Sequence, residues 1–280
     1  EQILVTRKPV GVVGVITPFN FPIAIPAWKI APALVYGNTV VGKPASTVPL
    51  LAMHLASALH EAGLPAGVLN LLIGGSALGD GLVRHAGVDA VTFTGSTGIG
   101  RRIAAAVAAR GVPAQCEMGG KNAAVVLDDA DLTLAVDQVM LGAFRSTGQK
   151  CTATSRLILT DGIADRFLEK LTDRATTLRV GDPTEGSTEM GPVVSQSARS
   201  TIATGIETAT TQGASVLAGG ARYTDGPLAD GYFIAPTVLE LPDTEADVWT
   251  DELFGPVLAV RRAADADEAF TLANDSEFGL

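Results

Sequence analysis

The chain is poor in cysteine, histidine and aromatic residues: its 280 residues include two Cys, three His and 5% Phe, Trp and Tyr. Two cysteines are too few for a disulfide framework, so we expect a protein of the reducing cytoplasm. No apolar run reaches the ~18 residues that a transmembrane helix requires. The most apolar stretch, residues 10–30, is interrupted by Pro18, Pro22 and Pro26. We therefore predict no membrane association, and no signal peptide is recognisable.

Basic side chains are also in the minority, with 20 Lys and Arg against 30 Asp and Glu, a net charge of −10. This balance argues against nucleic acid as a partner. No metal site is predicted. What the chain does have is aliphatic residues, within a hydrophobic fraction of 47%, and 31 glycines. Aliphatic runs suit parallel strands buried under helices, and glycines suit tight turns or close approach to a ligand.

Strand and helix patterns alternate over the first 115 residues. Strands are predicted over residues 10–16, 39–42, 68–73 and 90–94, and helices over 22–35, 49–61, 77–85 and 101–110. The helix over 49–61 is expected to be amphipathic, with one face that carries Leu50, Leu51, His54, Leu55, Ala58 and Leu59. This alternation predicts an α/β fold with an open parallel sheet and helices on both of its faces.

The alternation becomes less regular at Gly119 and Gly120, where we place the domain boundary. Strands are predicted over 114–117, 123–127 and 156–159, helices over 131–144, 163–178 and 197–212, and a surface loop over 181–189. Short strands and turns follow up to residues 255–257. The prediction is therefore a first domain over residues 1–118 and a second over 119–280.

Two short segments offer the groups needed for covalent catalysis at a carbonyl: 117–122 begins with Glu117, and 146–151 ends with Cys151. A thiolate is a good nucleophile, and a nearby carboxylate can serve as its base or activate water. Each residue also has a simpler explanation, Cys151 as a small buried side chain and Glu117 as a surface carboxylate. Cys116, with strand-like flanks, is assigned to the buried class.

Three further positions are candidates for binding. Asn20 lies among two aromatics and two prolines, and could donate to an oxyanion or cap the next helix. Segment 95–100, between a strand and a helix, could hold a pyrophosphate at the helix N-terminus, although its spacing departs from the usual dinucleotide fingerprint and a plain turn fits equally well. Lys43 could bind a ribose or a phosphate, or could be a solvated lysine at a strand end.

Glu252 and Phe254 lie beside the Gly-Pro turn at residues 255–256. A carboxylate can hold ribose hydroxyls, and an aromatic ring can pack on a nicotinamide. An ordinary surface turn is the alternative at this position.

These segments occur together and in one order. The chain resembles the aldehyde dehydrogenase superfamily over nearly its whole length, on residues 18–22, 28–34, 38–45, 93–100, 117–122, 148–151 and 251–257. The resemblance implies a Rossmann-like coenzyme domain and a second α/β catalytic domain. It also implies NAD- or NADP-dependent oxidation of a small-molecule aldehyde to the acid, through a hemithioacetal and a thioester on a cysteine.

The resemblance also implies residue roles. Cys151 matches the nucleophile, Glu117 the base that activates water, Asn20 the oxyanion-hole amide, and Lys29 a lysine that supports proton movement. Glu117 separates the chain from CoA-acylating relatives, which commonly lack that base. The positions implied in coenzyme binding are Ile16, Thr17, Phe19, Lys43, Ser46, Gly75, Gly79, Thr94, Gly95, Ser96, Gly100, Met118, Gly119, Glu252 and Phe254.

The chain departs from the family pattern at two positions. Phe19 stands where Trp is usual, and Ser46 stands where many NAD-preferring members have Glu. Without that carboxylate the 2′-phosphate of NADP meets less repulsion, so NADP as well as NAD is compatible with this position. Phe19 and segment 148–156 resemble the branch that oxidises α-ketoglutarate semialdehyde (2,5-dioxopentanoate).

Family members are longer than this chain. We therefore expect a chain truncated at both ends, from a parent protein that is a homodimer or homotetramer. Two alternatives stay open. One is an inactive fragment that keeps the fold, and the other is thioester or ester hydrolysis by Cys151 and Asn20 as a side activity.

Overall fold

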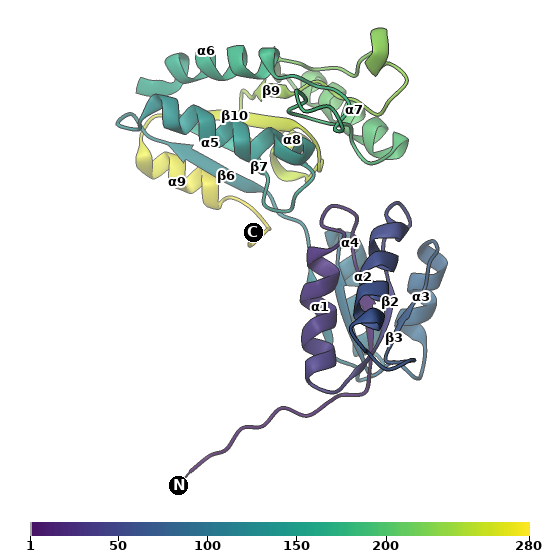
Figure 1. Cartoon of the computed structure of the whole chain (residues 1–280). Coiled ribbons are helices and arrows are strands. Elements are labelled where there is room, and N and C mark those ends of the chain that lie inside the picture. Colours follow the sequence, from purple (N-terminus) through teal and green to yellow (C-terminus); the bar gives the residue numbers. More distant parts are fainter. Residues whose placement is uncertain (1) are drawn as a thin grey trace. The chain divides into compact units, whose positions relative to one another are not determined.

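The computed structural model describes residues 2–280, and the chain divides into two compact units (Figure 1). One unit ends at Gly119, and the other runs from Gly120 to Leu280. Each contains its own five-stranded sheet with helices packed on it. Among residues 2–280, no helix has both the length and the apolar character needed to cross a bilayer.

The first unit is a parallel sheet in the order β3-β2-β1-β4-β5. Its strands are β1 (Val12–Ile16), β2 (Thr39–Lys43), β3 (Leu69–Leu71), β4 (Ala90–Thr94) and β5 (Ala114–Glu117). Its helices are α1 (Ala24–Val35), α2 (Pro49–Glu61), α3 (Ser76–Arg84) and α4 (Thr97–Ala108). The winding reverses between β1 and β4, which makes this the topological switch point of the sheet. The predicted parallel sheet is confirmed.

The two faces of this sheet bury different helices because neighbouring strand residues point to opposite sides. Val13 and Val15 pack with Ile30 of α1 and with α2, whereas Val91 and Phe93 pack with α3 and α4. Helices therefore cover both faces, as the alternating pattern predicts.

The structure differs from expectation at two of these helices. Leu50 and Leu51 of α2 are exposed, because the packed stripe of that helix runs through Ala52, Leu55 and Leu59. The last predicted helix of this unit, α4, begins at Thr97 rather than at residue 101, inside the glycine-rich segment. A Cβ at Gly100 would lie 2.6 Å from the Met118 sulfur, so close packing outweighs the poor helix propensity of glycine.

The second unit is a mixed sheet in the order β6-β7-β10-β9-β8, in which only β8 is antiparallel to its neighbour. Its strands are β6 (Asn122–Val126), β7 (Thr154–Thr160), β8 (Ser215–Ala218), β9 (Thr237–Glu240) and β10 (Val257–Ala263). Its helices are α5 (Leu132–Phe144), α6 (Asp161–Thr177), α7 (Gln196–Thr211), α8 (Asp247–Thr250) and α9 (Ala266–Asn274). Helices α5 and α6 cover one face, and α7, α8 and α9 cover the other.

The sequence pattern missed part of this unit. It did not predict the central strand β10 or helices α8 and α9. Helix α8 has one turn, too short to show a helical period. Strand β10 is buried at four consecutive residues, so it lacks the alternation of a half-exposed strand.

We expect the N-cap of α5, the helix that leads into the Cys151 segment, to contribute measurably to stability. The Asp131 carboxylate accepts hydrogen bonds from the amides of Thr133 and Leu134, both at 3.0 Å. Asp131→Ala should lower the free energy of unfolding by about 1 kcal/mol in urea titrations. Asp129→Ala, in the same turn without a capping role, is the control. Equal effects of the two variants would contradict the assignment.

Candidate functional site

The candidate residues of the first unit gather at one edge of its sheet. Ile16 ends β1 with Thr17 directly after it, Lys43 ends β2, Thr94 ends β4 and Glu117 ends β5. Since all five strands are parallel, their carboxyl ends share one edge, and the switch point between β1 and β4 opens at it. Parallel sheets of this kind bind ligands at that position.

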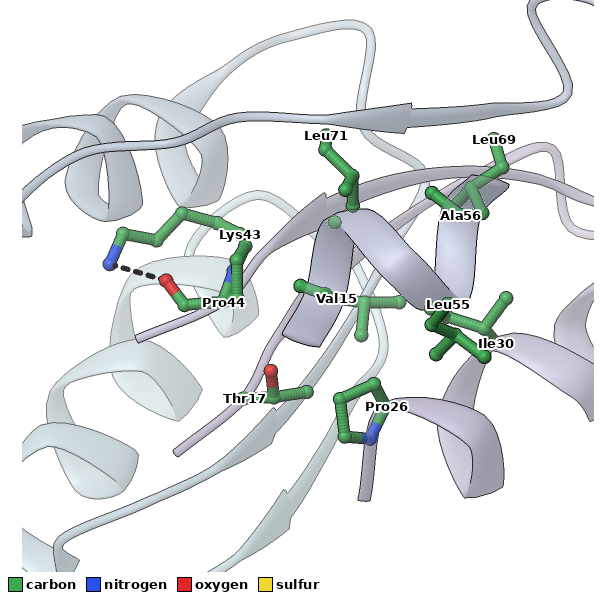
Figure 2. A pocket seen from close by; sticks show the side chains of 12 residues that line it. Val15, Thr17, Pro26, Ile30, Lys43, Pro44, Leu55, Ala56, Leu69 and Leu71 are labelled. Atoms are coloured by element: carbon green, nitrogen blue, oxygen red, sulfur yellow. Dashed lines mark hydrogen bonds between the residues drawn. The ribbon is translucent and has the colours of Figure 1, made fainter. Parts of the chain in front are cut away.

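Lys43 is buried, with 9% of its surface exposed, so the alternative of a solvated lysine is wrong. Burial lowers the pKa of its ammonium group, which donates to the Pro44 carbonyl at 3.3 Å. Figure 2 shows Lys43 and Thr17 beside a narrow pocket whose other walls are mostly apolar. The stem of Lys43 passes close to Gly79, where a Cβ would lie 3.7 Å from it. Ser46 and Gly75 are exposed.

The N-terminus of α4 has the features of an anion site. Ser96 is its N-cap in extended conformation with no side-chain capping bond, and the first turn carries no acidic residue. The Thr97 hydroxyl is buried without a hydrogen-bond partner in the described chain. Free amides, a helix dipole and an unsatisfied hydroxyl together suit a phosphate group. Thr97 was not predicted from the sequence, because only burial reveals its unsatisfied oxygen.

Gly95 and Gly100 have a structural reason to be glycine. A Cβ at Gly95 would clash with the Phe93 ring, and one at Gly100 would clash with Met118. The Gly95 amide donates to the Glu117 carbonyl at 3.1 Å, which ties the start of this loop to β5. Met118 therefore supports the loop by packing under α4.

Asn20 does not cap the following helix, so that alternative is wrong. The N-cap of α1 is Ile23, and no side chain caps it. Asn20 is half-buried, and its carboxamide makes no hydrogen bond within residues 2–280. Its NH2 group is thus available to a ligand. Phe19, directly before it, is half-buried as well.

Lys29 is the centre of a polar network on the α1 side of the sheet. Its ammonium donates to the Thr92 hydroxyl at 2.8 Å, the Phe93 carbonyl at 3.1 Å and the Gln115 side-chain oxygen at 2.8 Å. The Gln115 amide nitrogen in turn donates to the Glu117 carboxylate at 2.8 Å. Burial lowers the pKa of Lys29, and the charge of Glu117 opposes this shift. Thr92 and Gln115 were not predicted from the sequence.

Cys116 points to the opposite face. Its sulfur lies 3.8 Å from the Gly100 carbonyl, and it packs in the core under α4. Burial raises the pKa of this thiol. These features agree with the structural role assigned to it.

In the second unit, Cys151 follows a strained loop. Ser146, Thr147 and Gly148 have φ angles of 57°, 59° and 65°. Left-handed backbone costs about 1–2 kcal/mol at a residue with a side chain, and such strain concentrates at functional sites. Buried contacts hold the loop: the Thr147 hydroxyl donates to the Gly191 carbonyl at 3.1 Å, and the Val194 amide donates to Gln149 at 2.9 Å.

The backbone around Cys151 is fixed from two sides. The Asn122 amide group donates to the carbonyls of Cys151 at 2.6 Å and Ala153 at 3.1 Å. A Cβ at Gly120 would lie 2.8 Å from the Cys151 carbonyl oxygen, so this glycine permits a close approach. The Cys151 thiol is free and half-buried.

Residues 120–121 also hold the segment that carries Glu252. The Gly120 amide donates to the Glu252 carboxylate at 3.3 Å, and the Lys121 ammonium donates to the Asp251 carbonyl at 2.7 Å. Burial raises the pKa of Glu252, and the Gly120 hydrogen bond opposes the rise. Phe254 has a φ of 52°, a second strained position. Residues 120–122 therefore contact both the Cys151 segment and the Glu252 segment. Glu117 belongs to the other unit, which ends at Gly119.

Comparison with known proteins gives a consistent result. The aldehyde dehydrogenase family model matches residues 1–280. The chain is 49% identical over 276 residues to the alpha-ketoglutaric semialdehyde dehydrogenase of Bacillus subtilis (strain 168), covering 98% of this chain and 57% of that protein. It is 43% identical to an aminoaldehyde dehydrogenase of Arabidopsis thaliana, covering 99% and 55%. The chain therefore spans about half the length of these curated relatives.

Solved structures agree. The betaine aldehyde dehydrogenase of Staphylococcus aureus in complex with NAD+ superposes with a TM-score of 0.94 at 40% identity, over 97% of this chain and 54% of that one. PnpE in complex with nicotinamide adenine dinucleotide gives 0.94 at 42% identity, over 98% and 56%. The resemblance inferred from the sequence segments is confirmed.

We expect Lys121 to make stability depend on pH. Burial lowers its pKa from 10.5 to about 8, so the native state binds this proton less tightly than the unfolded chain does. Its contribution to the free energy of unfolding should therefore rise by about 2 kcal/mol from about pH 7.5 to about pH 9.5. Urea titrations of the wild type and Lys121→Met should show this difference in pH dependence.

Lys8→Met, at an exposed lysine, is the control and should keep the wild-type pH dependence. A Lys121→Met variant whose stability follows the same pH course as the wild type would show that this ammonium titrates normally.

Proposed function

Because the chain belongs to the aldehyde dehydrogenase family, we propose that its protein oxidises an aldehyde to the carboxylic acid with NAD+ or NADP+. The observation that carries the proposal is the family match over all of residues 1–280, which includes Cys151, Glu117 and Asn20. The balanced reaction consumes aldehyde, oxidised coenzyme and water, and yields acid, reduced coenzyme and a proton.

The residues present fit a dinucleotide. The unsatisfied Thr97 hydroxyl and the uncapped N-terminus of α4 suit a pyrophosphate, and the buried Lys43 suits a ribose. When bound, the nicotinamide accepts a hydride from the substrate carbon. The residues proposed to hold the coenzyme are Ile16, Thr17, Phe19, Lys43, Ser46, Gly75, Gly79, Thr94, Gly95, Ser96, Gly100, Met118 and Gly119, with Glu252 and Phe254 of the second unit.

Cys151 begins the chemistry in this proposal. Its thiolate adds to the aldehyde carbon, a C–S bond forms, and the carbonyl oxygen becomes an oxyanion. The unpaired Asn20 amide and the Cys151 backbone N–H donate to this oxygen, where charge develops. The strained loop before Cys151 supports the proposal because such strain concentrates at functional sites.

Glu117 completes the cycle by activating water. Its carboxylate takes a proton from the water, whose oxygen bonds to the thioester carbon while the C–S bond breaks. The acid leaves, and Cys151 returns as a thiolate. Lys29, hydrogen-bonded through Gln115 to Glu117, supports this proton movement.

The substrate proposed is α-ketoglutarate semialdehyde. Phe19 and residues 148–156 favour it, and the Bacillus subtilis relative at 49% identity is named for that activity. A cytoplasmic homodimer or homotetramer is the assembly we expect. Steady-state kinetics of the native protein should compare α-ketoglutarate semialdehyde with aminoaldehydes and betaine aldehyde as substrates, with NAD and NADP in parallel.

Replacing the nucleophile should separate catalysis from coenzyme binding. We expect Cys151→Ala to lower aldehyde oxidation by at least about a thousandfold, because no thioester can form. Coenzyme binding, measured by calorimetry, should stay unchanged. Cys116→Ala is the matched control, since that thiol packs in the core, and should keep activity within a few fold. Undiminished NAD(P)H production by Cys151→Ala would refute the assignment.

Ser46 should influence coenzyme choice. It follows Lys43 by three residues and is exposed, so a carboxylate there would repel the 2′-phosphate of NADP. We expect Ser46→Glu to lower the NADP:NAD ratio of kcat/KM by about tenfold. Ser46→Gln, similar in size but neutral, should change the ratio much less. A ratio that moves equally in both variants would show that charge is not the cause.

A further inference from the structure

A line of polar side chains leads from the buried Lys29 to Glu117, on the α1 side of the first sheet. Thr92 pairs with Gln115 and Thr94 pairs with Glu117 between β4 and β5. Gln115 and Glu117 are two residues apart in one strand, so they point to the same face. Lys29 reaches Gln115 from α1, with 9% of its surface exposed.

The charged groups on either side of the Gln115 amide, Lys29 and Glu117, fix its orientation. An ammonium only donates hydrogen bonds, and a carboxylate only accepts them. The amide must therefore present its oxygen to Lys29, at 2.8 Å, and its nitrogen to Glu117, at 2.8 Å. No direct hydrogen bond or ion pair joins Lys29 to Glu117 within residues 2–280.

Lys29 is itself held in place by hydrogen bonds, so it fixes the position of the Gln115 side chain. All three of its N–H groups are used, by Thr92, Phe93 and Gln115. The amide it holds engages only Oε1 of Glu117, whereas Oε2 has no partner in the described chain. One carboxylate oxygen is thus fixed, and the other is open to a ligand or to water.

From this geometry we propose that Gln115 is a positioning residue, which holds Glu117 so that its free oxygen takes the proton of the hydrolytic water. The inference rests on the proposed function and adds to it a residue that acts through the base. In the step concerned, the water proton passes to Oε2, the water oxygen bonds to the thioester carbon, and the thiolate of Cys151 leaves.

A purely structural role for Gln115 would be to satisfy the buried ammonium of Lys29. Gln115→Glu separates the two roles, because it keeps an acceptor for Lys29 but removes the donor to Glu117. It also places a second negative charge beside Glu117. Gln115→Leu removes both of these bonds and the one that Gln115 accepts from the Thr92 hydroxyl, so it is expected to lose stability as well as activity.

The charged and titratable groups near Gln115 and Glu117 come from α1 and from β5. Lys29 of α1 and the Cys116 thiol interact electrostatically with Glu117. Helix α4 packs on the opposite face of the sheet through Gly100, Ile103 and Val107, and its Arg101 and Arg102 are exposed. A charge introduced at residue 115 should therefore act mainly on Lys29 and Glu117.

The test uses the native protein with its coenzyme and an aldehyde that it oxidises. In Gln115→Glu we expect the first turnover to release NAD(P)H at the wild-type rate, followed by about tenfold slower turnover. Mass spectrometry should show the acyl group accumulating on Cys151. The acidic limb of the pH–rate profile should lie at higher pH than in the wild type, because the added negative charge favours protonated groups nearby. Gln196→Glu adds the same charge at an exposed position of α7 and should behave as the wild type.

Glu117→Gln provides the reference for complete loss of the base. Slow deacylation in Glu117→Gln, with wild-type deacylation and pH profile in Gln115→Glu, would overturn the role of Gln115 alone. Wild-type deacylation in Glu117→Gln would overturn the assignment of the base, and this inference with it.

Discussion

Parallel strand pairing is the constraint on which the first unit depends. Because every strand of that sheet runs in one direction, residues that end separate strands arrive at one edge. Lys43, Thr94 and Glu117 are far apart in sequence and share this edge for that reason alone. The reversal of winding between β1 and β4 then opens the edge at the point where α4 begins.

A buried lysine organises the candidate residues of each unit. A desolvated ammonium must be hydrogen-bonded, so it dictates where its acceptors lie. Lys29 gathers Thr92 and Gln115 beside Glu117, and Lys121 holds the segment of Asp251 and Glu252. Lys29 acts on Glu117 through the Gln115 side chain, and Lys121 acts on Glu252 through the backbone of Asp251, the preceding residue.

In the second unit, strained backbone also occurs at the candidate residues. The left-handed residues before Cys151 and at Phe254 are costly by themselves, and tight contacts maintain them. A Cβ at Gly148 would overlap the Gly255 carbonyl, so the two strained segments touch through glycine backbone. The loop of the proposed nucleophile and the segment proposed to hold the nicotinamide therefore restrain each other.

The sequence by itself determined the class of the protein, most of its helices and strands, and the segments that hold Cys151, Glu117 and Asn20. The helices and strands follow from local periodicity, and the class follows from the resemblance of short segments to a known family; both depend on neighbouring residues only. The tertiary structure alone decided that Gln115 joins Lys29 to Glu117, that the Thr97 hydroxyl is unsatisfied, and that Leu50 is exposed. Burial and hydrogen-bond partners are set by residues distant in the chain, and no local pattern records them.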